Sequence, residues 1–99
     1  MKKLKIYDII EVLEQTFDLT WDEILSGERD EDRVYARYLF ASELRDKGVS
    51  YPQIGKALGK RTHFSAWNYC NNYQPPRFLE EFYGARFAEL KSKKLEELS

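Results

Sequence analysis

The sequence predicts an all-α fold, a compact bundle of about six helices that contains a helix-turn-helix. Apolar residues recur every three or four positions in most segments, which is the spacing of one helix face. Capping residues and glycines stand at the ends of these segments, and the alternating pattern of strands is nearly absent.

The first half of the chain is predicted to form three helices. Apolar residues at helical spacing predict a first helix from Leu4 to Phe17. Thr20 and Glu23 form a capping box, which predicts a short second helix that ends near Gly27. A long third helix follows the loop GERDED and stops at Gly48, because glycine readily adopts a positive φ. The expected inner face of this helix comprises Val34, Tyr38, Ala41 and Leu44.

Two short helices follow, separated by a tight turn. Ser50 and Gln53 form a second capping box, and Gly59 ends the helix that they begin. Thr62 is a suitable N-cap for the next helix, which runs from about His63 to Tyr73. This pair has the dimensions of a helix-turn-helix, a motif whose second helix enters the major groove of DNA.

The last helix is predicted from about residue 77 to residue 97, after the break at Gln74-Pro75-Pro76. We expect residues 1–99 to form a single domain, because a chain of this length can build one modest core. The apolar side of the last helix is expected to comprise Leu79, Phe82, Phe87 and Leu90.

Charge is strongly segregated along the chain, although the net charge is only −1. From Asp8 to Asp32 there are ten acidic residues and a single basic one, Arg29. From Lys47 to Leu79 there are five basic residues and no acidic one. This acid-free stretch contains the predicted helix-turn-helix and can present a local positive potential to phosphate groups.

The composition argues against several other classes of protein. The sequence lacks an apolar run of the roughly 20 residues that span a membrane, so we expect a cytoplasmic protein with no membrane partner. One His and one Cys predict neither a disulfide nor a His/Cys metal site, and no cofactor is expected. Its carboxylates fall at helix-surface spacing beside no His or Cys motif, so we expect neither catalysis nor a small-molecule substrate.

The candidate DNA-contacting residues lie at the turn and at the start of the second helix of the motif. Lys60 and Arg61 occupy the turn, where they can reach phosphates, and Lys56 adds positive charge on the preceding helix. The residues that lead the second helix can hydrogen-bond base edges or contact a thymine methyl group. The expected base-facing set is Thr62, His63, Phe64 and Asn68.

These residues also have simpler interpretations. Without DNA contact, Lys60 and Arg61 are solvated turn residues, and His63 is a surface or cap residue. For Phe64 the sequence leaves three roles open: contact with DNA, cover for a partner surface, or packing against the final helix. A further pair, Trp67 and Tyr69, is expected in the core or an interface rather than at bases.

Three groups of residues give the chain a resemblance to a known family. They are the pair Ala36-Arg37, the run from Ser50 to Gly55 with Pro52 and Ile54, and the alternating series Gly59, Arg61, His63 and Ser65. With the spacing between them, the segment from about Ile9 to Tyr73 resembles the C-terminal DNA-binding domain of the bacterial replication initiator DnaA. The resemblance implies a Trp-repressor-like helical domain that reads a short duplex site.

The resemblance also implies roles for individual residues. Arg37 is expected to reach DNA from the long helix. Arg61 and Ser65 are expected to hold phosphates, and His63 is expected to face bases.

The sequence departs from the family's pattern at positions where the family reads bases. Thr62 stands where Asp is usual, Phe64 where Ser or Thr is usual, and Asn68 where His is common. The loop before the long helix is basic in the family, whereas here it reads SGERDEDR, whose acids would repel phosphates. An altered DNA site is therefore expected.

Two hypotheses of function follow. The first is a stand-alone helix-turn-helix domain that binds double-stranded DNA in replication or its regulation, in a phage or other mobile element. A homodimer or a protein partner would then strengthen an otherwise weak contact. The alternative is a domain that keeps this fold, has lost DNA binding, and uses the acids of SGERDEDR and the aromatic helix 64–73 for protein–protein interaction.

Overall fold

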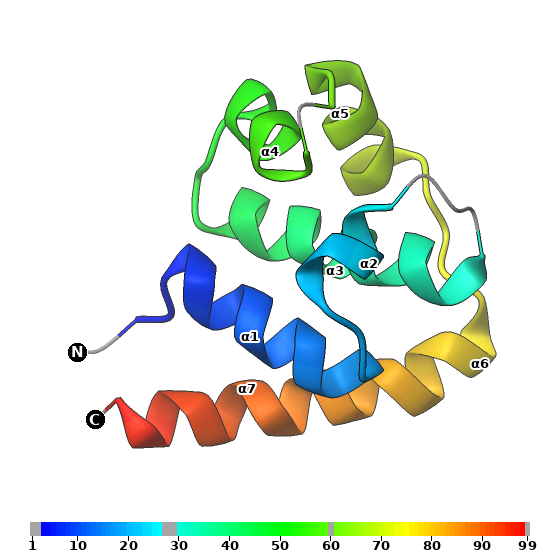
Figure 1. Ribbon diagram of the computed structural model, residues 1–99. Coiled ribbons are helices and arrows are strands. Elements are labelled where there is room, and N and C mark those ends of the chain that lie inside the picture. Colours follow the sequence, from blue (N-terminus) through cyan, green and yellow to red (C-terminus); the bar gives the residue numbers. More distant parts are fainter. Residues whose placement is uncertain (1–2, 27–29, 60, 99) are drawn as a thin grey trace.

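A computed structural model describes residues 3–26, 30–59 and 61–98 and has an all-α architecture. No strand occurs in these three ranges, as the sequence predicted. The helices follow one another in the order of Figure 1, with the bounds α1 Ile6–Phe17, α2 Trp21–Leu25, α3 Glu31–Asp46, α4 Tyr51–Ala57, α5 His63–Asn71, α6 Arg77–Leu79, η1 Glu80–Gly84 and α7 Ala85–Glu97.

The long helix α3 lies at the centre and separates two layers (Figure 1). Helices α4 and α5 cover one side of it, and α1 and α7 lie side by side on the other, with α2 packed along its flank. Because α3 is covered on several sides, its buried residues are not confined to one stripe. They include Tyr35, Ala36, Phe40, Ala41 and Leu44.

This burial corrects the predicted inner face of α3. Ala41 and Leu44 are buried as expected, but Val34 and Tyr38 are only partly buried, and Tyr35 and Phe40 fill the centre instead. The prediction assumed a helix that packs on one side only, whereas α3 packs against helices on several sides.

Local capping sets the beginning of the short helix α2. The backbone N–H of Glu23 donates to Thr20 Oγ1 at 3.1 Å, and the backbone N–H of Thr20 donates to Glu23 Oε1 at 3.0 Å. Hydrogen bonding of the Glu23 carboxylate by Thr20, chiefly by its backbone N–H, lowers the pKa of Glu23. The capping box predicted from the sequence is therefore present, while the predicted end of the helix at Gly27 lies outside the described residues.

The C-terminal segment is one bent helical run in which a π-helical turn, η1, joins α6 to α7. A π turn has more residues than an α turn, so it rotates the residues that follow around the axis. Tyr83 points inward and stacks on Phe17 with ring centroids 4.4 Å apart. Phe82, predicted to be apolar core, is 66% exposed. The expectation for Phe82 was wrong because Tyr83, the next residue, takes the inward position between the buried Leu79 and Phe87.

Helix α7 is held against the rest of the molecule by one buried ring and by ion pairs. Phe87 is 4% exposed in the core, Lys91 Nζ lies 2.6 Å from a carboxylate oxygen of Glu43, and Lys94 Nζ lies 3.0 Å from one of Glu11. The hydrogen bond to Glu11 raises the pKa of Lys94. No helix among the described residues is both long and apolar enough to cross a membrane.

The opposite placements of two phenylalanines provide a test of this packing. We expect Phe87→Ala to lower the free energy of unfolding by about 3 kcal/mol, because it opens a cavity in the core. Phe82→Ala, on the exposed side, should change it by less than about 0.5 kcal/mol. Urea denaturation followed by circular dichroism measures both values. Equal losses of unfolding free energy in the two variants would contradict the opposite placements of Phe82 and Phe87.

Candidate nucleic-acid interface

The turn between α4 and α5 is closed by a direct backbone contact. The backbone N–H of Arg61 donates to the carbonyl oxygen of Gly55 at 2.8 Å. A Cβ atom on Gly55 would collide with the carbonyl oxygens of Arg61 and Thr62. Glycine is therefore required at position 55, because any side chain would push the turn away from α4.

Helix α4 ends immediately before this turn. Gly59 adopts φ +82°, a left-handed conformation that suits glycine at a helix end. Ile54 and Leu58 are buried beneath the motif and hold α4 against the core. Together these features give the α4–α5 pair the compact form of a helix-turn-helix.

The first turn of α5 is capped by side-chain hydroxyls. Thr62 Oγ1 accepts a hydrogen bond from the backbone N–H of Ser65 at 3.2 Å, and the two hydroxyl oxygens lie 3.4 Å apart. Thr62 is exposed and Ser65 is half-buried. The predicted N-cap is thus present, and both hydroxyls already take part in capping.

The outer face of α5 carries two large exposed rings. Phe64 is 61% exposed and Trp67 is 40% exposed, and their rings stack with centroids 6.3 Å apart and planes 15° apart. His63 is exposed and Asn68 is half-buried. At helical spacing Trp67 and Asn68 lie one turn after Phe64, and His63 lies one turn before Trp67, so His63 and Asn68 flank the two rings on opposite edges of the outer face.

Trp67 was expected in the core or an interface, and its 40% exposure excludes the core alternative. Ala66 is the buried residue of α5. Trp67 is the next residue and therefore points about 100° away from it around the helix axis. The spacing of Phe64 and Trp67, three residues apart, is the signal in the sequence that could have placed both rings on one face.

The inner face of α5 rests on a cluster of tyrosines. Tyr73 contacts Tyr38 and Tyr69, with ring centroids 5.1 Å and 6.5 Å away. Burial raises the pKa of Tyr38 and Tyr73, and it also raises the pKa of the Cys70 thiol. These groups are therefore uncharged at neutral pH and act as packing that fixes the orientation of α5.

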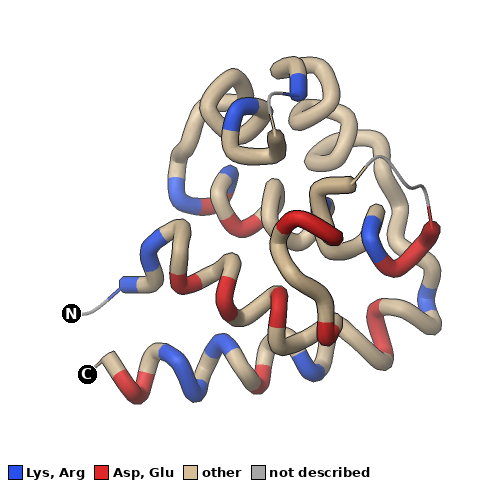
Figure 2. The backbone as a smooth tube through the Cα atoms, in the orientation of Figure 1, with Lys and Arg blue, Asp and Glu red and all other residues tan. Residues whose placement is uncertain are grey.

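The basic residues of the helix-turn-helix differ in exposure and in hydrogen bonding. Lys56 is exposed on α4. Arg61 is half-buried, and its Nη1 donates to the carbonyl oxygen of Leu58 at 2.7 Å, which caps the end of α4. Lys60 lies outside the described residues. Acidic residues line α1, α2 and the start of α3, whereas α4 and α5 have none (Figure 2).

Arg37, expected to reach DNA, lies inside the protein and is 4% exposed. Its Nε donates to the carbonyl oxygen of Ile24 at 2.8 Å, and Nη2 donates to that of Ser26 at 3.0 Å. Its Nη1 donates to the hydroxyl of Tyr69 on α5 at 3.2 Å. Arg37 therefore links α2, α3 and α5. Its side chain is not at the protein surface, where it could anchor DNA.

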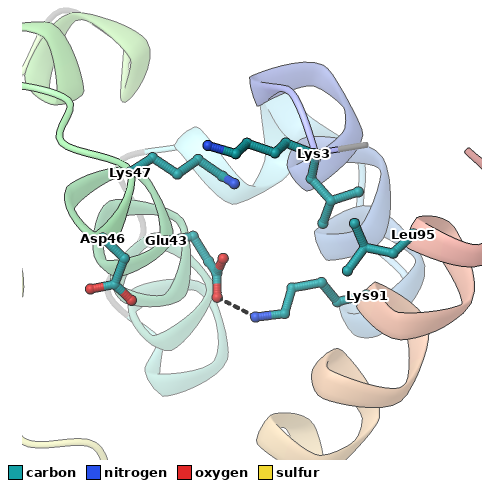
Figure 3. Close-up of a pocket in the computed structure, with 7 residues that line it drawn as sticks. Lys3, Glu43, Asp46, Lys47, Lys91 and Leu95 are labelled. Carbon is teal, nitrogen blue, oxygen red and sulfur yellow. Dashed lines mark hydrogen bonds and ion pairs between the residues drawn. The ribbon is translucent and has the colours of Figure 1, made fainter. Parts of the chain in front are cut away.

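A hollow of the described surface lies away from α4 and α5. Figure 3 shows it between the end of α3, the N-terminal segment and α7, where Lys91 pairs with Glu43. Its volume is about 560 Å³, and its polar lining mixes lysines with acids. The described residues include no group of three or more His, Cys, Asp or Glu side chains that could hold a metal ion.

The geometry of α4, the closed turn and α5 defines a helix-turn-helix domain of the DNA-binding class. The profile of the bacterial DnaA protein helix-turn-helix family matches residues 6–72, so the chain belongs to this family. No curated protein and no solved structure gives a significant match. The family match ends before α6, and α7, which lies beyond it, packs against α1.

The contact at Gly55 generates one prediction. Helix propensity alone predicts that Gly55→Ala stabilises α4 by roughly 1 kcal/mol. The collision with the turn predicts the opposite sign, a loss of about 2 kcal/mol in the free energy of unfolding. Urea denaturation decides between them. Gly48→Ala is the comparison, since nothing lies within 4 Å there and only its positive φ, +83°, opposes alanine. A Gly55→Ala protein as stable as wild type would contradict the close approach.

The burial of Arg37 generates a second prediction. Arg37→Met should lower the free energy of unfolding by about 3 kcal/mol, because it leaves two carbonyl oxygens without their donors. The control is Arg77→Met, whose side chain is 92% exposed in a surface ion pair and whose loss should cost less than about 1 kcal/mol. Unchanged stability with reduced DNA affinity in Arg37→Met would instead assign this residue to DNA contact.

Proposed function

We propose that this domain binds double-stranded DNA with the start of α5 in the major groove, and that it acts in replication or its regulation. The observation that carries the proposal is the exposed outer face of α5 on an acid-free helix-turn-helix. The major groove of B-form DNA admits an α-helix, and the N-terminal residues of a recognition helix face the base edges. Thr62 is the N-cap of α5, His63 and Phe64 begin the helix, and Asn68 follows Phe64 about one turn later.

The phosphate contacts in this proposal come from the residues around the turn. Lys56 and Lys60 supply positive charge, while Arg61 and Ser65 lie at the turn and the first turn of α5. Arg37 has no part in the contact, because its guanidinium is committed to the interior. With so few basic contacts, the affinity of one domain for DNA should be modest and should depend strongly on salt.

The sequence that the domain reads should differ from that of a typical family member. Thr62, Phe64 and Asn68 stand at positions where the family's pattern has other residues, and these positions belong to the base-facing set. An aromatic ring and an amide offer bases different contacts from those of the hydroxyl and imidazole that they replace.

A second candidate function is protein–protein interaction without DNA binding. The observation that favours it is the exposure of Phe64 and Trp67, since large exposed rings also occur in protein interfaces. Acidic side chains at the start of α3, Asp30 and Glu31, are exposed and would suit a basic partner. In this case duplex DNA would not be bound even at low salt.

Charge reversal near the turn tests the two candidates. Lys56→Glu/Lys60→Glu should abolish binding to a random-sequence duplex pool, because each change replaces a phosphate attraction with a repulsion. Fluorescence anisotropy at several salt concentrations measures the affinity and its salt dependence. Lys3→Glu/Lys93→Glu changes the net charge equally on other parts of the molecule and should bind nearly as wild type does.

Three outcomes distinguish the candidates. Salt-dependent binding that only the Lys56→Glu/Lys60→Glu protein loses supports DNA recognition through the turn. Equal loss in both double variants indicates attraction by overall charge rather than by this motif. No binding by folded wild-type protein at low salt contradicts the DNA-binding proposal and favours the protein partner.

A further inference from the structure

The outer face of α5 has an unusual chemistry for a helix that reads DNA, since no residue from His63 to Asn71 is Asp, Glu, Lys or Arg. Contacts to guanine O6 and N7 in the major groove come most often from Arg or Lys. Neither residue type is present in this helix. Whatever discrimination α5 provides must therefore come from neutral polar groups or from apolar contact.

Several of the neutral polar groups are already used within the protein. The Asn71 amide donates to the Trp67 carbonyl oxygen at 2.9 Å and to the Tyr51 hydroxyl at 3.2 Å. The side-chain oxygen of Asn68 accepts from the Asn72 amide at 2.7 Å. Thr62 Oγ1 accepts the capping hydrogen bond. These internal contacts leave the two rings as the largest part of the exposed face that is not engaged.

The rings form a continuous apolar surface. Phe64 and Trp67 are 61% and 40% exposed, and they lie nearly parallel. In the major groove, the apolar group that a base pair presents is the C5-methyl group of thymine. A ring placed against such a methyl removes apolar area of both groups from water.

We propose that Phe64 and Trp67 together read thymine methyl groups in the major groove, with Trp67 joining Phe64 as a specificity-determining residue. This inference rests on the proposed DNA binding and adds the chemical feature that the domain recognises. The two rings already stack on one another in the free protein, so the apolar surface is formed before DNA arrives. Duplexes rich in thymine along the contacted edge should bind best.

Stacking of the rings on unpaired bases is a different use of the same surface. Proteins that bind single strands combine stacking rings with a positively charged groove that follows the backbone. Helix α5 has no Lys or Arg to form such a groove. It also belongs to a helix-turn-helix, a motif that fits the major groove of a duplex. The observations therefore favour the methyl groups of paired thymines.

Replacement of thymine by uracil removes the methyl group and leaves base pairing intact, so it tests the proposal without altering the protein. A duplex enriched from a random pool by the wild-type protein would be remade with deoxyuridine at every thymine. Each buried methyl group that is lost should weaken binding by about four-fold. Fluorescence anisotropy at a single salt concentration measures the affinity of the two duplexes.

Alanine variants then assign the effect to the rings. Phe64→Ala and Trp67→Ala should bind the thymine duplex more weakly and should distinguish thymine from uracil by less than about two-fold, because the surface that contacts the methyl is lost. Phe82→Ala is the matched control, since that ring on η1 is 66% exposed, close to the 61% of Phe64, and it should keep the wild-type discrimination.

The remaining outcomes overturn the proposal in distinguishable ways. Equal wild-type affinity for the thymine and uracil duplexes, or discrimination that persists in both alanine variants of α5, overturns the methyl contact and leaves DNA binding standing. Failure of folded protein to bind or enrich any duplex overturns both proposals. Tighter binding to an unpaired oligonucleotide, lost in Phe64→Ala and Trp67→Ala, would show that the rings stack on unpaired bases instead.

Discussion

The buried guanidinium of Arg37 is the interaction on which the arrangement of the other helices depends. It projects from the central helix and donates to the carbonyl oxygens of Ile24 and Ser26 at the end of α2 and to the hydroxyl of Tyr69 on α5. A charged group buried this deeply is tolerated only because its donors are satisfied. Its hydrogen bonds fix both the short helix and the recognition helix relative to α3.

The backbone contact between Arg61 and Gly55 complements this anchor at the other side of α5. Arg37 and the tyrosine cluster hold the inner face of the helix, while the closed turn sets where the helix begins. With both constraints in place, α5 presents a fixed outer face at the surface. Phe64 and Trp67 are then exposed because the buried positions of α5 are already filled, chiefly by Ala66.

In the proposed complex with DNA, two regions of the motif have different tasks. The positive charge proposed to meet phosphates comes from Lys56, Lys60 and Arg61, around the turn. Helix α5 contains no Lys, Arg, Asp or Glu, so in this proposal its discrimination between sequences rests on shape and apolar contact. The acids of α1, α2 and the start of α3 lie on other helices than α4 and α5 (Figure 2).

The sequence by itself determined the all-α class, the family, the caps at Thr20 and Thr62, and the helix-turn-helix, because helical periodicity and capping are local properties. It placed Arg37 at the surface, although Arg37 shares its helix face with buried Phe40, Ala41 and Leu44, a spacing that could have indicated burial. Only the tertiary structure decided the orientations of Arg37, Trp67 and Phe82. Arg37 is turned inward by carbonyl oxygens distant in sequence. Trp67 is exposed because Ala66 takes the buried position of α5, and Phe82 is exposed because Tyr83 takes the inward position beside Phe17. Packing between helices, rather than the helix propensity of each segment, therefore determines which side chains face the solvent.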